Sequence, residues 1–164
     1  MKKILSVRGT DFLAFLICAC LIGFAIYLQF SKNIEPCPLC IIQRVIVVIT
    51  GLLFFLGSLQ RFGSIIWLKI YHGFICLVAL SGAGIAWRQV WLQLHPEKHA
   101  QACAPSLEFM LRNLPLTDTL RLLLTGGDDC ATVHWTFLNL SIPMWTLIFF
   151  CLLALLALIN ALRI

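Results

Sequence analysis

Two cysteines separated by two residues are the strongest candidates for chemistry in this chain. They are Cys37 and Cys40, in the segment Cys37-Pro-Leu-Cys40 directly before a long apolar stretch. Both the C-x-x-C spacing and a position at a helix N-terminus favour the thiolate, which is the form of cysteine that attacks disulfides. Pro38 suits the first turn of a helix, where its missing N–H would have no partner anyway. The segment therefore predicts a redox-active pair at the start of a helix.

An arginine follows this pair inside the apolar stretch. Arg44 lies four residues after Cys40, so a helix would place the two side chains on the same face. An arginine at the start of a membrane helix is costly and marks a functional residue by default. It could hold a thiolate or polarise a carbonyl group of a bound ligand. The alternative is that it only reaches toward lipid headgroups.

Composition indicates the class of protein that must position these residues. Hydrophobic residues make up 61% of the 164-residue chain and charged residues only 12%, against about 25% in soluble domains. A soluble fold of this length could not bury so much apolar surface, so we expect lipid to surround it. The net charge of +5 is scattered among apolar blocks, and a nucleic-acid partner is therefore not expected.

Four apolar stretches are long enough to cross a membrane as helices, which takes about 20 residues each. They are residues 12–30, 41–60, 64–87 and 144–162. The first follows two lysines, as in a secretory signal, but it exceeds the apolar length of about 7–15 residues typical of such signals. We expect an all-α membrane protein, a single domain over residues 1–164 built as a bundle of four transmembrane helices.

Lysines and arginines near helix ends predict the orientation, because they favour the cytoplasmic side. Six fall on the side of the two termini and three on the other, once Arg112 and Arg121 are excluded as too far from any helix end. The six are Lys2, Lys3, Arg8, Arg61, Lys69 and Arg163. We expect both termini in the cytoplasm, a short outward loop at 31–40 and a long one at 88–143.

The long outward loop is too long to be a passive connection. Apolar residues recur at helical spacing over residues 107–114 and again over 116–124, which predicts two short amphipathic helices. Such helices suit the membrane surface, although they could equally cap the bundle without touching lipid.

The cysteines divide between the membrane and the outward side. Four lie outward, where an oxidising compartment favours disulfides: Cys37, Cys40, Cys103 and Cys130. The last two could form a purely structural staple of the long loop. Zinc bound by all four is a further alternative, but zinc usually takes two closely spaced pairs, and the chain has one C-x-x-C, so we expect no metal. The remaining cysteines lie in the apolar stretches and are expected to be unreactive: Cys18, Cys20, Cys76 and Cys151.

Several segments of the chain, taken in order, resemble the DsbB family of bacterial inner-membrane oxidoreductases. They are Glu35-Pro-Cys-Pro-Leu-Cys-Ile-Ile-Gln-Arg44, Trp87-Arg-Gln-Val-Trp-Leu-Gln-Leu-His-Pro96, Cys103, Gly127-Asp-Asp-Cys130 and Trp135-Thr-Phe-Leu-Asn-Leu-Ser-Ile-Pro143. The resemblance runs from the first expected helix to the fourth. It implies an enzyme that reoxidises a periplasmic dithiol oxidase of the DsbA type and so sustains disulfide bond formation.

The resemblance also implies a role for each candidate residue. A reduced DsbA-like thiolate would attack Cys103 of a Cys103–Cys130 disulfide, and Cys130 would then attack Cys37 and displace Cys40. Cys40 would pass the electrons to a membrane quinone, ubiquinone or menaquinone, with Arg44 near a quinone oxygen. An oxidase of the DsbA type has a potential near about −120 mV, so its electrons need an acceptor of still higher potential, which a quinone provides.

Two other functions fit parts of the pattern. A quinone-linked oxidoreductase of the vitamin K epoxide reductase type also combines a C-x-x-C with a four-helix bundle, but its C-x-x-C normally lies in the last helix. A membrane scaffold with two structural disulfides is the non-enzymatic alternative. Quinone-dependent oxidation of a dithiol partner would distinguish a catalyst from a scaffold.

Overall fold

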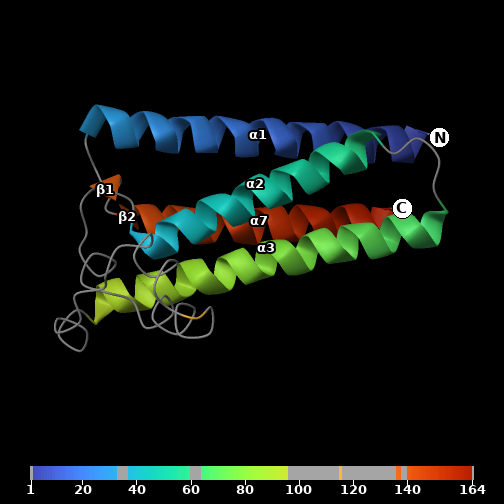
Figure 1. Cartoon of the computed structure of the whole chain (residues 1–164). Coiled ribbons are helices and arrows are strands. Elements are labelled where there is room, and N and C mark those ends of the chain that lie inside the picture. Colours follow the sequence, from blue (N-terminus) through green and yellow to red (C-terminus); the bar gives the residue numbers. More distant parts are fainter. Residues whose placement is uncertain are drawn as a thin grey trace.

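The computed structural model describes residues 2–32, 37–59, 64–95, 115, 136–137 and 140–163. Within these residues it contains four long helices that run lengthwise beside one another (Figure 1). They are α1 (Lys2–Lys32), α2 (Pro38–Leu59), α3 (Ile65–Leu94) and α7 (Ile142–Arg163). All four are long and apolar enough to cross a membrane. The expected bundle of four membrane helices is confirmed.

The helices are longer than the apolar stretches that predicted them. Helix α1 begins at Lys2 rather than residue 12, and α3 continues to Leu94 rather than ending at residue 87. The added turns carry polar side chains, and a helix satisfies its backbone hydrogen bonds whether its side chains are polar or not. The first residues of both expected outward loops therefore belong to helices, and the two expected short helices at 107–114 and 116–124 lie outside the described residues.

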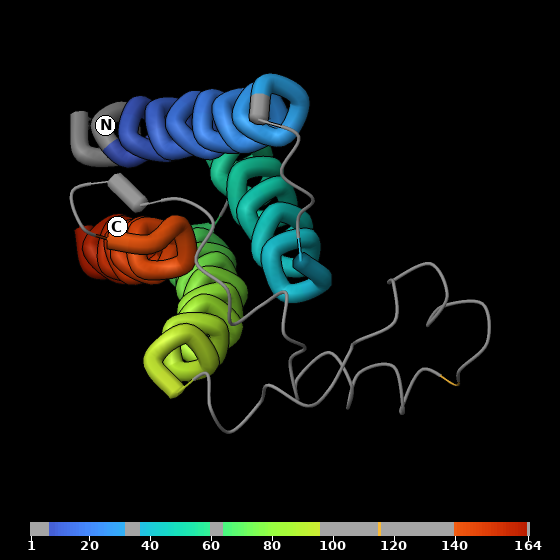
Figure 2. The backbone as a smooth tube through the Cα atoms, turned by 90° about the vertical axis from the view of Figure 1, so that its left-hand side faces the viewer, coloured from blue at the N-terminus to red at the C-terminus, as the bar shows by residue number. Residues whose placement is uncertain are grey.

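The packing order follows the chain closely. Helix α2 packs against α1 and α3, and α3 packs over most of its length against α7. Figure 2 looks onto the end of the bundle where α2 begins and shows α2 between α1 and α3, with α7 beside α3. Helix α1 starts and α7 ends at the opposite end (Figure 1). We call these the cysteine end and the terminal end.

Small residues allow α3 and α7 to approach closely. Helix α3 buries a face of small residues in the core, at Ala79, Gly82, Ala83 and Ala86. A Cβ atom on Gly82 would lie 2.5 Å from the ring of Phe150 on α7, so only glycine fits there. By contrast, large apolar side chains on the outer faces of the helices are exposed, among them Leu77, Ile66 and Leu152. A protein whose outer surface is apolar fits a lipid surrounding.

A short hairpin leads into α7 at the cysteine end. Strands β1 (Thr136–Phe137) and β2 (Leu140–Ser141) pair antiparallel, with Thr136 opposite Ser141. The Ser141 hydroxyl donates to the side-chain carbonyl of Gln93 on α3, at 2.7 Å. The hydrogen bond fixes the entry of α7 to the last turns of α3.

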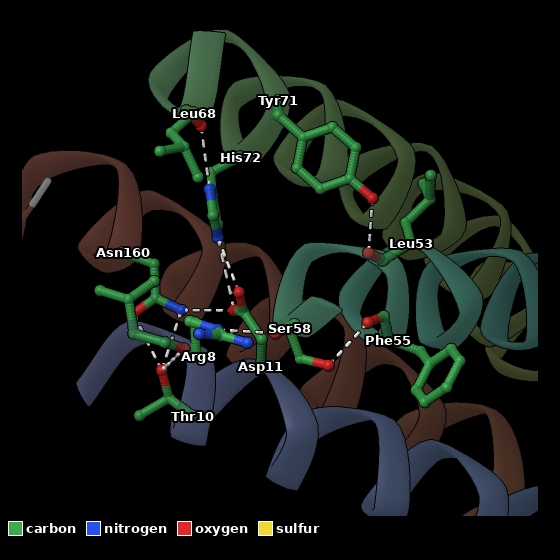
Figure 3. A network of polar contacts seen from close by, with 11 residues as sticks. Arg8, Thr10, Asp11, Leu53, Phe55, Ser58, Leu68, Tyr71, His72 and Asn160 are labelled. Atoms are coloured by element: carbon green, nitrogen blue, oxygen red, sulfur yellow. Dashed lines mark hydrogen bonds and ion pairs between the residues drawn. The ribbon is translucent and has the colours of Figure 1, made fainter. Parts of the chain in front are cut away.

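A buried polar network joins the helices at the terminal end (Figure 3). Asp11 of α1, His72 of α3 and Asn160 of α7 are each fully buried. The Asp11 carboxylate lies 3.1 Å from His72 Nε2 and accepts from Asn160 Nδ2 at 2.8 Å. His72 Nδ1 must donate to the Leu68 carbonyl, 2.9 Å away, because a carbonyl only accepts. Nε2 is therefore the ring nitrogen that faces the Asp11 carboxylate.

Helix α2 is connected to the same region by contacts to its backbone carbonyls. Arg8 Nε donates to the Ser58 carbonyl at 2.8 Å, and the Tyr71 hydroxyl donates to the Leu53 carbonyl at 2.6 Å (Figure 3). These bonds link α1 and α3 to the last two turns of α2. All four helices are thus connected by polar contacts at the terminal end.

Removing one member of this network should destabilise the bundle. We expect Asp11→Ala to lower the free energy of unfolding by about 1–3 kcal/mol, because His72 and Asn160 lose their shared partner in a buried site. Thermal unfolding in detergent measures the change. Ser81→Ala is the control, since that hydroxyl is exposed and bonds only within its own helix. Equal melting temperatures for Asp11→Ala and the control would contradict a stabilising role.

Candidate functional site

The C-x-x-C segment lies at the cysteine end, where α2 begins. Pro38 is the first residue of α2, and Cys37 directly precedes it. The Cys37 carbonyl accepts a hydrogen bond from the Ile41 amide at 3.2 Å, which closes the first helical turn. The expected helix start at this segment is confirmed. The two sulfurs consequently lie beside the positive end of the helix dipole, which favours a negative charge on them.

The two thiols are close enough to form a disulfide. Cys37 Sγ lies 3.2 Å from Cys40 Sγ, and the two sulfurs are not bonded covalently to each other. A disulfide bond is about 2.05 Å long, so a small movement of either side chain would join the sulfurs. Cys37 is only 7% exposed and packs with Leu39 and Leu92, whereas Cys40 is half-buried. Cys40 is therefore the more exposed residue of the pair.

One buried glutamine contacts the sulfurs and a second one binds it, and the sequence analysis predicted neither. Gln89 Nε2 donates to Cys40 Sγ at 3.1 Å and to Cys37 Sγ at 3.3 Å. Gln43 Nε2 in turn donates to Gln89 Oε1 at 2.7 Å. Gln43 follows Cys40 by three residues and so shares its helix face. That spacing could have predicted that Gln43 lies near the cysteines. Gln89 lies in the part of α3 beyond the expected span, and no local pattern marks it.

Arg44 is held by a third glutamine. Arg44 lies one turn of α2 beyond Cys40, as expected, and its Nη1 donates to Gln29 Oε1 of α1 at 2.6 Å. The Arg44 side chain is half-buried. A guanidinium carries five N–H donors, so this contact orients the group toward α1 without using it up. The sequence did not predict the role of Gln29 either, because its partner Arg44 is on another helix.

The other cysteines occupy two different situations. Cys103 and Cys130 lie outside the described residues. The four expected to be unreactive lie within membrane helices, and of these Cys18 is buried in the core. Among the described cysteines, Cys37 and Cys40 are the two whose sulfurs lie within hydrogen-bonding distance of each other. Two thiols this close together can form a disulfide between them.

The fold and this pair define a class, the multi-pass membrane thiol oxidoreductases. Comparison with known proteins gives the family. The model for disulfide bond formation protein DsbB matches residues 8–160. The chain is 46% identical to disulfide bond formation protein B of Nitrosococcus oceani, over 94% of this chain and 90% of that one. The identity is 46% for the protein of that name from Methylococcus capsulatus, over 88% of each chain, and 45% for that from Hahella chejuensis, over 92% and 90%.

The chain therefore belongs to the DsbB family and is an oxidoreductase of disulfide bond formation. The expected resemblance to that family is confirmed. The start of α2 at the C-x-x-C agrees with this family rather than with the vitamin K epoxide reductase type, in which the motif normally lies in the last helix. Membership in a family of enzymes also argues against the alternative of a non-enzymatic membrane scaffold.

The different burial of the two sulfurs predicts different reactivity. In the reduced protein, Cys40 should react at least several-fold faster than Cys37 with a small water-soluble thiosulfonate, because Cys40 is the more exposed residue and reactivity toward such reagents depends on access to the thiolate. Mass spectrometry of peptides from short reaction times measures both rates. Cys18 should stay unmodified until the protein is unfolded. Faster modification of Cys37 than of Cys40 would be incompatible with this geometry.

Proposed function

We propose that the chain lies in the bacterial inner membrane with both termini in the cytoplasm. In this orientation the cysteine end faces the periplasm. Three basic residues of the described helices support it, since Arg8, Lys69 and Arg163 all lie toward the terminal end. The orientation brings Cys37 and Cys40 to the compartment in which disulfides form.

We further propose that the enzyme carries electrons from a DsbA-like dithiol oxidase in the periplasm to a membrane quinone. The observation that carries this proposal is the pair of sulfurs 3.2 Å apart at the start of a membrane helix, one turn from a half-buried arginine. Such a pair can receive electrons from a water-soluble thiol on one side. It can release them to a lipid-soluble acceptor on the other.

The thiol–disulfide steps would run through two pairs. A thiolate of the reduced partner attacks Cys103, forms a mixed disulfide and releases Cys130 as a thiolate. Cys130 attacks Cys37, forms a second bond and displaces Cys40, which leaves with the electron pair. The partner's other thiol then displaces Cys103, and the partner is oxidised. Two electrons have then moved from the partner to the membrane enzyme. The two protons that the partner's thiols lose pass to the enzyme's thiolates or to water.

The residues around Cys40 suit a quinone, ubiquinone or menaquinone. A quinone ring needs an apolar surrounding and donors for its two carbonyl oxygens. Arg44 has N–H groups beyond the one bound to Gln29, and neighbouring apolar side chains such as Val45 face outward to lipid. Bound there, the quinone would be the final acceptor of the two electrons. Cys40 would deliver the electrons, and Arg44 would hold a carbonyl oxygen.

Removing the resolving cysteine should trap the complex with the partner. We expect Cys130→Ser to accumulate a mixed disulfide between Cys103 and the DsbA-like protein, because no thiol remains to attack Cys37. A non-reducing gel followed by peptide mapping measures the adduct. Cys103→Ser is the matched control and should form none. An adduct that maps to Cys37 would show that the proposed order of exchange is wrong.

Replacing the arginine should weaken the quinone step alone. We expect Arg44→Ala to raise the KM for quinone about tenfold or more, the size expected for a lost hydrogen bond from a charged donor. Arg44→Lys should rescue only in part, since it lacks the planar fork of donors. The rate of Cys103–Cys130 exchange with the partner should not change. Steady-state kinetics with varied quinone measures both, and normal quinone use by Arg44→Ala would leave the arginine with only an anchoring role.

A further inference from the structure

Gln43 and Gln89 form a buried chain of hydrogen bonds, which we call the relay, in which Gln43 donates to Gln89 and Gln89 donates to the two sulfurs. Gln89 is 3% exposed and Gln43 is 4% exposed, so water does not compete for their amides. Burying an amide costs free energy unless its groups are bonded. Here the Gln43 N–H group bonds the Gln89 carbonyl at 2.7 Å, and the Gln89 N–H groups bond the two sulfurs at 3.1 and 3.3 Å.

The relay determines which end of the Gln89 amide faces the sulfurs. Because Gln89 Oε1 accepts from Gln43, its NH2 group is the end turned toward Cys37 and Cys40. The reverse orientation would turn an oxygen lone pair toward sulfur. That contact would be repulsive whenever a sulfur carries negative charge. Gln43 therefore keeps a donor in place at the sulfurs.

A donor at this position does not act equally on the two redox states. A thiolate is a strong acceptor because hydrogen bonds to charged groups are the strong ones, whereas the sulfurs of a disulfide are neutral and accept weakly. The Gln89 amide consequently stabilises the reduced pair more than the oxidised pair. Stabilising the reduced form makes a disulfide a stronger oxidant.

We infer that Gln89, oriented by Gln43, increases the oxidising strength of the Cys37–Cys40 disulfide. Gln89 touches the reacting sulfurs, and Gln43 is a positioning residue that acts through it. The inference rests on the proposed role of Cys37–Cys40 as the pair that takes up electrons. Its benefit follows from the partner, because a DsbA-like oxidase gives up electrons only to a strongly oxidising disulfide.

The redox equilibrium of the pair tests the inference without partner or quinone. The parent is the full chain with Cys103→Ser and Cys130→Ser, which removes the loop pair. It is equilibrated with mixtures of reduced and oxidised glutathione, quenched in acid, and the fraction of Cys37–Cys40 disulfide is determined by mass spectrometry. Each disulfide reduced takes two electrons from two glutathione thiols, which leave as one oxidised glutathione, and their protons pass to the cysteines or to water.

The matched variants replace each glutamine by methionine, which has a similar length and flexibility but no N–H donor. We expect Gln89→Met to shift the equilibrium about tenfold toward the disulfide, which is about 30 mV for a two-electron couple. Gln43→Met should shift it less, in the same direction. Gln93→Met is the control, because Gln93 lies one turn further along α3 and bonds Ser141 instead of the sulfurs.

Two further readouts separate this role from ordinary packing. The difference between Gln89→Met and the parent should grow from mildly acidic to mildly alkaline buffer, because the amide acts mainly on the thiolate. In the Gln89→Met background, adding Gln43→Met should change nothing more, since Gln43 acts through Gln89. Melting temperatures show that the variants are folded, and a shift caused by loosened packing would be independent of pH.

Several outcomes would overturn the inference. Gln89→Met could share the equilibrium of the parent, the control Gln93→Met could shift it equally, or the shift could be the same at every pH. Additive effects of the two substitutions would exclude Gln43 as the positioning residue. If the Cys37–Cys40 pair of the parent does not interconvert between dithiol and disulfide at all, the proposed function itself fails, and this result is distinct from the others.

Discussion

Polar groups enclosed by an apolar bundle must find their partners within it, and this constraint governs both ends of the molecule. Unbonded polar groups in a lipid environment cost several kcal/mol each, roughly. At the terminal end the constraint is met by Asp11, His72 and Asn160, which bond one another across three helices. At the cysteine end it is met by Gln43, which donates to Gln89, and by Gln89, which donates to the sulfurs. The side chains of the first cluster bond one another, whereas the hydrogen bonds of the second cluster end on the two cysteine sulfurs.

This difference separates stability from reactivity along the helix axes. Polar contacts connect all four helices at the terminal end (Figure 3). At the opposite end the contacts serve particular groups, since Gln89 reaches the sulfurs and Gln29 holds Arg44. The terminal end thus provides a fixed frame. In the proposed function, a thiol at the other end exchanges disulfide partners and meets a lipid-soluble acceptor, and a position near the membrane surface suits both steps.

The sequence was sufficient for features that depend on neighbouring residues. Apolar length gave the four membrane helices, and Pro38 with the C-x-x-C gave the start of α2. The position of Arg44 one turn after Cys40 followed from helical spacing alone. These predictions succeed because one helix determines them.

Features that depend on contacts between helices could not be predicted in the same way. Gln89 and Gln43 are 46 residues apart, and Asp11 and Asn160 are 149 apart. Nothing near Gln89 in the sequence indicates which helix it faces. Averaging hydropathy over a span also hides a single buried Asp or His within it. The length of α3 was underestimated for a related reason, because its last turns mix polar with apolar residues, and Gln89, Val90 and Leu92 are nevertheless buried in the bundle.

Electron transfer from a dithiol to a quinone through Cys40 is the central claim, and anaerobic mixing tests it most directly. The purified full-length protein, a reduced DsbA-like protein and ubiquinone are combined, and the quinone absorbance and the partner's thiols are followed together. We expect one quinone to be reduced for each partner disulfide formed, and Cys40→Ser to abolish both changes. Oxidation of the partner without reduction of the quinone, or undiminished quinone reduction by Cys40→Ser, would contradict it.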